Sequence, residues 1–225
     1  MSRFARLLVA GLATTLICST PALAPHAWAQ GGKNNFDIYR SQTNFNAADK
    51  ARITKATAYL QALTGAEGRF EQSDERGRTV QGKWFLQRPG KMRFEYDPPS
   101  SLLVVSDGRQ VKTWDPRLQS FNAYPLSETP LSLFLDKTIR FDQGVLITEV
   151  TSNATSFTLT ARSRTKSVQG SVRLTFDQAG DGPLTLRQWT IIDPQGQATT
   201  VRLLSLGESH PAASLFVLEK PQSKK

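Results

Sequence analysis

From residue 66 to residue 206 the sequence alternates apolar and polar residues with a period of two, in short runs separated by turn residues. Such alternation is typical of strands with one buried face, and consecutive runs joined by short turns favour antiparallel hairpins. The predicted strands span residues 66–75, 78–87, 91–96, 102–107, 109–115, 118–124, 145–151, 155–163, 169–177, 184–193 and 198–206. The sequence therefore predicts one antiparallel sheet of about eleven strands, and a sheet of this size curls strongly.

Two helical segments interrupt the strands. Apolar residues recur at helical spacing after Asp49, which we predict to cap a helix over about 47–64 that Gly65 ends. A second, short helix is predicted over 130–137, with a proline in its first turn. We expect both helices to cover the concave face of the sheet, an α+β layout that is mainly β. Residues 215–218 are expected to add an edge segment.

The N-terminus has the pattern of an export signal. Arg3 and Arg6 precede an apolar run of about a dozen residues, which is too short to span a bilayer comfortably, and Ala27-Trp28-Ala29 fits the rule for signal-peptide cleavage. No composition break suggests a second domain. The predicted organisation is a cleaved signal peptide over 1–29, a flexible arm over 30–46 and a single domain over 47–225.

Composition limits the chemistry that remains after cleavage. Cys18 is the only cysteine, it lies in the predicted signal, and Leu16-Ile17 before it does not fit a lipoprotein signal. The exported chain is therefore expected to lack disulfides, a thiol nucleophile and zinc–thiolate sites. It keeps 26 Lys and Arg residues against 19 Asp and Glu, a net charge of about +7. Because the basic residues are scattered and the chain is exported, anionic protein or lipid surfaces fit this charge better than nucleic acid.

Catalytic patterns are not found. His210 is the single histidine after the signal, and no Gly-x-Ser-x-Gly elbow, metal-ligand spacing or phosphate-binding loop occurs. Dispersed carboxylates leave a paired-carboxylate glycosidase site formally open, without any residue that favours it. The sequence thus predicts a protein that is not an enzyme and that binds no cofactor or metal.

The most informative stretch is a hairpin over residues 82–99. Trp84 and Leu86 share one face of the first strand, which leads to Arg88 and a Pro-Gly turn at 89–90. Met92, Phe94 and Tyr96 share one face of the second strand. An apolar sheet face therefore ends in one guanidinium group.

The order of residues around this hairpin resembles the LolA family of periplasmic lipoprotein carriers. The resemblance is densest in Arg88-Pro89-Gly90-Lys91-Met92-Arg93-Phe94-Glu95-Tyr96-Asp97-Pro98-Pro99, followed by Leu-Leu-Val-Val-Ser-Asp-Gly at 102–108. Trp114-Asp115-Pro116 and the Thr-Pro-apolar segment 129–135 also resemble family motifs. The likeness runs over roughly 47–221.

This resemblance implies a fold and a function. The fold is an unclosed antiparallel β-barrel of about eleven strands with a helical lid over an apolar cavity. The implied function is that of a monomeric periplasmic chaperone without covalent chemistry. It would take acylated lipoproteins from an inner-membrane ABC transporter and hand them to an outer-membrane acceptor or to the membrane itself. Arg88 occupies the family position at which an arginine hydrogen-bonds lid carbonyls and favours closure.

Residues for the cavity and the lid follow from the apolar pattern within that fold. The predicted acyl-chain cavity consists of Trp84, Leu86, Met92, Phe94, Tyr96, Leu103, Val105 and Trp114. The predicted lid residues are Leu131, Phe134 and Leu135. Parity fixes which residues of one strand share a face but not which face is concave, so Phe85, Leu102 and Val104 remain alternatives to their neighbours.

Three other functions stay open. One is a periplasmic regulatory or sensory module on the same fold, and another is a carrier of a different amphiphile, such as a glycolipid or pigment intermediate. An exported hydrolase is the third, and the missing catalytic constellation argues against it. The chain also ends shortly after Phe216, which puts in doubt any function of longer C-terminal elements in the family.

Overall fold

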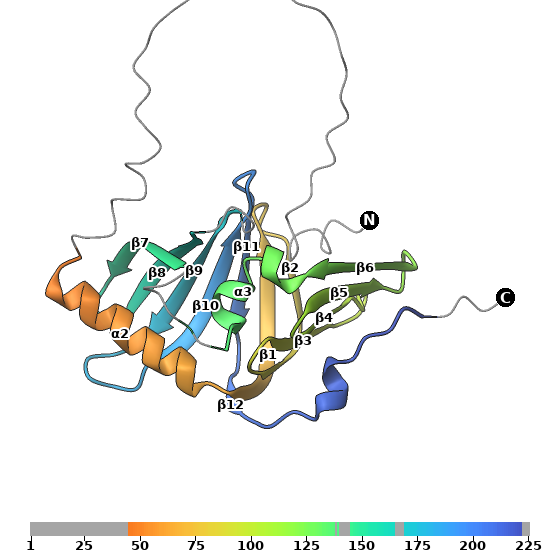
Figure 1. The fold of residues 1–225 in the computed structure, drawn as a ribbon, viewed down its shortest axis with the longest axis horizontal. Helices are drawn as coiled ribbons and strands as arrows, with labels where there is room; N and C mark the ends of the chain where they lie inside the picture. Colours follow the sequence, from red (N-terminus) through yellow and green to blue (C-terminus); the bar gives the residue numbers. More distant parts are fainter. Residues whose placement is uncertain (1–44, 138, 140–144, 165–168, 222–225) are drawn as a thin grey trace, which may run out of the picture.

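The structure is a computed structural model that describes residues 45–137, 139, 145–164 and 169–221. The predicted signal at 1–29 and nearly all of the predicted arm at 30–46 lie outside the described residues. The described part is one large antiparallel sheet, one long helix, α2 (Ala47–Ala62), and short helical turns (Figure 1). The predicted class, mainly β with helices over an unclosed curled sheet, is confirmed.

All eleven predicted strands are present, with ends that differ from the prediction by up to three residues. They are β1 (Gly65–Asp74), β2 (Thr79–Gln87), β3 (Lys91–Tyr96), β4 (Leu103–Asp107), β5 (Gln110–Asp115), β6 (Ser120–Pro125), β7 (Val145–Ser152), β8 (Ser156–Ser163), β9 (Ser171–Asp177), β10 (Thr185–Ile192) and β11 (Ala198–Leu203). The sequence analysis missed a two-residue strand, β12 (Gly207–Glu208), which pairs with β1.

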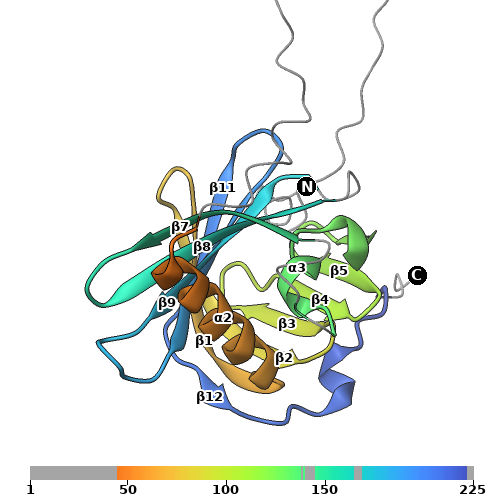
Figure 2. The ribbon, with the colours of Figure 1, turned by 60° about the vertical axis from the view of Figure 1, so that its left-hand side comes forward.

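Two meanders make up the sheet. Strands β1 to β6 follow one another as hairpins, β7 to β11 do the same, and β11 pairs with β1 to join the two series. β6 and β7 therefore end the sheet on opposite sides, and the chain must cross between them. This crossing contains η2 (Leu126–Glu128) and α3 (Ser132–Leu135), which lie on the same side of the sheet as α2 (Figure 2).

Helix α2 packs on the concave face through one stripe. Ala56 and Leu60 are buried, and Ile53 and Tyr59 pack against the same core. Asn46 caps the helix by accepting a hydrogen bond from the Asp49 N–H at 2.8 Å. The prediction that Asp49 is the cap is wrong: the helix begins at Ala47, as predicted, and Asp49 lies in its first turn.

The end of α2 also differs from the prediction. The helix stops at Ala62, and Gly65 begins β1 instead of capping the helix. A side chain at Gly65 would come within 2.3 Å of the Ser209 carbonyl oxygen, because the chain beyond β11 passes alongside. This glycine is therefore required by a close approach of two backbones and not by helix termination.

The predicted lid helix over 130–137 is shorter than expected. Pro130 precedes the helix, Leu131 is its N-cap, and α3 holds only four residues. A proline lacks the backbone N–H group and has a fixed φ angle, so the 3-10 turn η2 does not continue through Pro130. A separate helix, α3, begins two residues later. The segment is nevertheless helical where the sequence places a helix.

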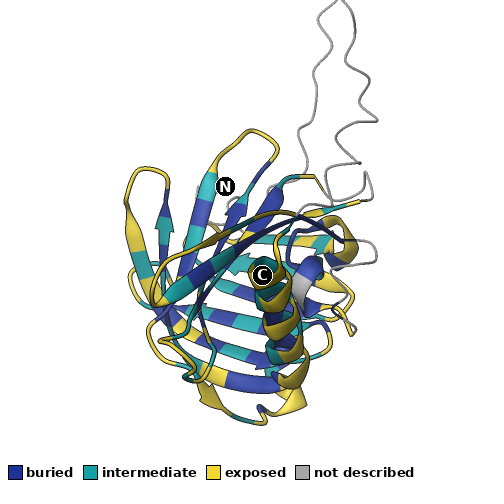
Figure 3. Ribbon diagram, turned by 90° about the vertical axis from the view of Figure 1, so that its left-hand side faces the viewer, coloured by how far each residue is buried: buried dark blue, intermediate teal, exposed yellow. Residues whose placement is uncertain are grey.

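One apolar core fills the curve of the sheet. It takes in buried residues from α2, the crossing segment and strands of both meanders, among them Leu60, Leu131, Phe94 and Trp189. Figure 3 shows buried and less buried residues alternating along the strands, with the exposed side of α2 turned away from the sheet. The alternation read from the sequence is thus the alternation between the two faces of the sheet.

The C-terminal segment packs on the outer face of the first meander. It forms η3 (Ala213–Phe216), which contacts β3 and β4, and Phe216 is buried there. Arg93 Nη1 donates to the Leu215 carbonyl oxygen at 2.9 Å, and Arg93 Nε pairs with Glu95 at 2.7 Å. The expected edge segment at 215–218 is therefore wrong, since the chain crosses the outside of the sheet instead of extending it.

Candidate functional site

The concave face of the first meander carries five of the eight residues predicted for an acyl-chain cavity. These residues have at most 4% of their surface exposed and belong to the interior core: Trp84, Leu86, Met92, Phe94 and Tyr96. Phe70 joins them from β1, with its ring edge-on to Phe94 at 5.0 Å between centroids. Phe94 in turn lies 6.0 Å from Trp189 of the second meander. Aromatic side chains of both meanders therefore meet inside the curve.

The other three predicted cavity residues lie on the opposite face. Leu103 and Val105 pair with Glu95 and Arg93, whose side chains point outward, and Trp114 pairs with Leu103. The expectation that they share the face of Phe94 is wrong. The neighbours kept as alternatives, Leu102 and Val104, hold the interior positions, whereas Phe85 lies opposite Arg93 on the outer face.

The turn between β3 and β4 causes this exchange. Phe94 pairs with Val104, so only even-numbered residues of β4 share its face. Parity within a strand is a local property, but parity across a turn depends on the number of residues that the turn consumes. Burial alone would mislead here, because Val105 is fully buried on the outer face, where η3 packs against β4.

Arg88 joins the ends of both helices. Its Nη1 donates to the carbonyl oxygen of Leu60 in the last turn of α2, and its Nη2 donates to the carbonyl oxygen of Asp136, which caps α3. The last carbonyls of a helix have no partner within the helix, so a guanidinium with several donors suits this position. Burial lowers the pKa of Arg88 from its ordinary value, an effect that the Asp136 carboxylate opposes. The group stays charged at neutral pH.

Two neighbouring turns hold Arg88 in place. The backbone N–H of Arg88 donates to Thr64 O at 2.7 Å. Gly90 has φ +75°, and a side chain there would come within 2.6 Å of Gly108 Cα in the β4–β5 turn. Ser106 Oγ donates to Gly90 O at 2.6 Å. The Pro-Gly turn and the Asp-Gly turn that the sequence revealed thus pack on each other beside the arginine.

The lid segment contacts this same corner. Gly90 N donates to Leu135 O at 2.7 Å, and Ile139 N donates to the side-chain oxygen of Gln61 at 3.3 Å. Leu131 and Leu135, both predicted as lid residues, are buried in the interior core together with Leu133. Phe134 lies in α3, and its side chain is outside the part that the structure describes. The sequence did not reveal that Gln61 and Gly90 hold the lid segment. Gly90 was recognised only as a turn residue, and Gln61 belongs to no motif.

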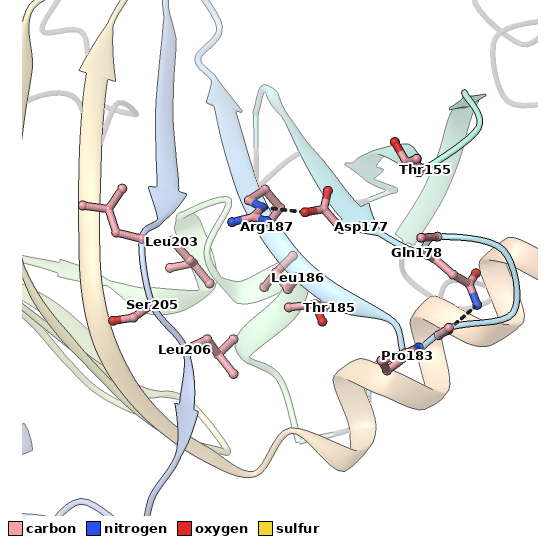
Figure 4. Close-up of a pocket in the computed structure, with 13 residues that line it drawn as sticks. Thr155, Asp177, Gln178, Pro183, Thr185, Leu186, Arg187, Leu203, Ser205 and Leu206 are labelled. Atoms are coloured by element: carbon pink, nitrogen blue, oxygen red, sulfur yellow. Dashed lines mark hydrogen bonds and ion pairs between the residues drawn. The ribbon is translucent and has the colours of Figure 1, made fainter.

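A slot of about 530 Å³ opens in the second meander, where the chain that follows β11 departs from β10. The pairing of β10 with β11 extends only as far as Gln188 and Arg202, and beyond β11 the N–H groups of Leu204 and Ser205 donate to Arg69 O on β1. Figure 4 shows aliphatic side chains between β10 and this departing chain. Two of them, Leu186 and Leu203, also belong to the interior core, so the slot reaches the core from the surface.

The described residues hold neither a metal-binding cluster nor a membrane-spanning helix. In those ranges no group of three or more His, Cys, Asp or Glu residues is placed to hold a metal ion. No helix within them is long and apolar enough to cross a membrane. The predicted Arg88 and the interior apolar residues remain the best-defined candidate site.

An unclosed antiparallel barrel with an apolar interior beneath helices is the class of fold that these observations define. The chain belongs to the LolA family: the sequence profile of the family, "Outer membrane lipoprotein carrier protein LolA", matches residues 61–219. That family consists of carrier proteins. Several of its curated members align with most of this chain.

Two curated relatives illustrate the match. The outer-membrane lipoprotein carrier protein of Pseudomonas fluorescens is 31% identical over 77% of this chain and 85% of its own length. That of Pseudomonas syringae pv. syringae is 29% identical over 79% and 86%. Among solved structures, the LolA superfamily protein from Nitrosomonas europaea has a TM-score of 0.45 at 10% identity and covers 76% of this chain and 97% of its own.

Proposed function

We propose that this protein is a periplasmic carrier that shields the acyl chains of lipoproteins between the inner and the outer membrane. The observation that carries the proposal is the position of Arg88. One side chain holds the C-terminal ends of both α2 and α3 over an apolar concave face. Opening these contacts would give acyl chains access to the interior without unfolding the sheet.

The energetics favour such a device. Each acyl methylene removed from water is worth about 0.8 kcal/mol, so acylated cargo needs a shield to cross an aqueous compartment. The same shield must release its cargo. Interior side chains and lid contacts that re-form in the empty protein compete with the acyl chains, so release becomes a shift between two populations.

The partners follow from this role. We infer that an inner-membrane ABC transporter supplies the cargo and that an outer-membrane acceptor, or the membrane itself, receives it. The carrier would act by binding and release alone, without cofactor or covalent chemistry.

The test is a release assay. The exported protein is added to inner-membrane vesicles that hold a labelled acylated lipoprotein and an ATP-driven releasing complex, and soluble lipoprotein that co-purifies with the protein is measured. We expect a stoichiometric complex with the acylated lipoprotein and none with the same lipoprotein lacking its acylated cysteine. If no complex forms while another carrier is loaded by the same vesicles, the cargo is a different amphiphile or the protein is a regulatory module.

A further inference from the structure

One polar side chain lies inside the apolar interior of the sheet. Gln72 on β1 has 1% of its surface exposed and is flanked by Val80 on β2 and Val201 on β11. Its Oε1 accepts a hydrogen bond of 2.6 Å from the Tyr96 hydroxyl. Its Nε2 is buried and has no hydrogen-bond partner among the residues that the structure describes.

The hydrogen bond from Tyr96 accounts for the carbonyl of Gln72 but not for its buried amide N–H group. A glutamine side chain offers two N–H donors and two acceptor sites, and leaving a buried donor unpaired costs free energy. An aliphatic residue of similar volume on this face would avoid that cost, as Val80 and Val201 do on either side. The Gln72 amide is thus a pre-oriented donor in a place that water does not reach freely.

Tyr96 fixes the direction of the amide. Burial raises the pKa of the Tyr96 phenol well above its ordinary value, so the hydroxyl keeps its proton and can donate it to Gln72. The Tyr96 ring packs edge-on against Phe70 at 5.1 Å between centroids, which limits its movement. With Oε1 engaged by Tyr96, the amide presents its donor group to the interior.

We propose that Gln72, oriented by Tyr96, donates a hydrogen bond to an acyl carbonyl oxygen of the cargo, in the ester or amide group that links the chain to its lipoprotein. This inference rests on the proposed carrier function. An acyl chain consists of methylene groups apart from that linkage, so the carbonyl oxygen is its one acceptor. The contact would select acylated ligands over alkyl ligands of the same length.

The position along the sheet is compatible with the Arg88 contacts. The Arg88 N–H bonds to Thr64 O, and Gln72 lies eight residues further along the chain, roughly 26 Å at about 3.3 Å per residue. The acyl region of one bilayer leaflet is about 15 Å thick. A chain with its carbonyl at Gln72 would therefore fit along the concave face between Gln72 and the corner that Arg88 occupies.

The test compares two ligands and four proteins. The ligands are a peptide carrying a diacylglyceryl cysteine with two ester-linked C16 chains and the same peptide with two ether-linked C16 chains. The proteins are the wild type, Gln72→Met, Tyr96→Phe and the control Gln81→Met, which removes an exposed glutamine on β2. Dissociation constants are measured below the concentration at which the peptides form micelles.

We expect the wild type and Gln81→Met to bind the ester ligand about tenfold more tightly than the ether ligand, the value of one good hydrogen bond. Gln72→Met should lose this preference and bind both ligands like the ether ligand, and Tyr96→Phe should reduce it. Gln72→Met removes one unpaired donor but also leaves the buried Tyr96 hydroxyl without its acceptor, so urea unfolding checks that this variant is folded before its binding is compared.

Two results overturn the inference. If Gln72→Met keeps the full ester preference, the carbonyl is bound elsewhere and Gln72 serves only a buried water molecule. If the wild type binds both ligands equally, no carbonyl is recognised, although the carrier function stands. Binding of neither ligand would instead remove the carrier function, and this inference with it.

Discussion

At the scale of single residues, Arg88 links two helices that are far apart in the sequence. It satisfies a carbonyl at the end of α2 and another at the end of α3, 76 residues apart from Leu60 to Asp136. Hydrogen bonds from a charged donor are stronger than neutral ones, yet they exchange with water once the lid moves. We therefore expect this one side chain to bias the lid toward closure without locking it.

Replacing Arg88 by leucine should separate loading from release. We expect Arg88→Leu to bind acylated lipoprotein in the release assay but to hand it over poorly, because the closed state no longer competes with the cargo. The free energy of unfolding should fall by about 1–3 kcal/mol, since two carbonyls lose a donor. Arg88→Lys keeps the charge but not the fork of donors, so its hand-over and its stability should lie between those of the wild type and Arg88→Leu. Normal hand-over by Arg88→Leu would disprove this role.

The ionisation of Asp74 makes the stability of the fold depend on pH in the acid range. Its burial opposes ionisation, but hydrogen bonds from the Arg78 side chain and from the Arg78 and Arg76 N–H groups outweigh that effect and hold the pKa of Asp74 below its ordinary value. A lowered folded-state pKa contributes stability above the unfolded-state pKa, about 3.9, and this contribution is lost as the pH falls through the folded-state pKa.

We therefore expect urea midpoints of the wild type to fall as the pH drops below about 4. Asp74→Asn should be less stable at pH 7 and should lose less stability on acidification. Asp181→Asn, at an exposed acidic residue between β9 and β10, serves as the control and should keep the acid dependence of the wild type. Identical acid dependence in Asp74→Asn and the wild type would show that Asp74 makes no such contribution.

At the scale of elements, the C-terminal segment covers part of the outer face of the first meander. Phe216 and Val105 are both buried, although neither belongs to the interior core. Arg93 holds this segment through the Leu215 carbonyl. The sheet thus has a second, smaller apolar contact on the face turned away from the proposed cavity.

Removing the Arg93 contact should loosen η3 without opening the interior. In Arg93→Met we expect faster hydrogen–deuterium exchange over residues 213–217, with unchanged exchange in β10 and β11. Arg173→Met, at an exposed arginine on β9, is the matched control and should leave both regions unchanged. If exchange over 213–217 stays at the wild-type rate, the Arg93 bond does not secure the segment.

At the scale of the whole molecule, the interior lies between two meanders that the β1–β11 pairing joins. Trp84 comes from the first meander and Trp189 from the second, and both are about 1% exposed. Trp114 lies on the outer face. Of the three tryptophans after the predicted signal, two can therefore report on the interior by their fluorescence and one on the outer face.

Cargo binding should change the fluorescence of the interior tryptophans alone. The variant Trp114→Phe keeps Trp84 and Trp189, and we expect a shift in its emission when an acylated peptide is added. The double variant Trp84→Phe/Trp189→Phe keeps only Trp114 and should show no shift. A shift in the double variant, with none in Trp114→Phe, would place the acyl chains on the outer face and contradict the proposed cavity.

The sequence by itself determined the local structure. Period-two alternation located all eleven long strands, and the Pro-Gly and Asp-Gly pairs located the turns around Arg88. These features depend on residues adjacent in the chain, whose side chains alternate between faces and whose backbone angles are restricted locally. Family motifs then connected these elements to the LolA family, to which the chain belongs.

Only the tertiary structure decided which faces and ends meet. The turn between β3 and β4 put Leu102 and Val104 inside, and Leu103 and Val105 outside. The pairing of β1 with β11 joined segments about 130 residues apart. It left the Gln72 amide N–H group in the interior without a partner among the described residues. Register across a turn and pairing between distant strands arise from the packing of the whole chain, so no local pattern encodes them.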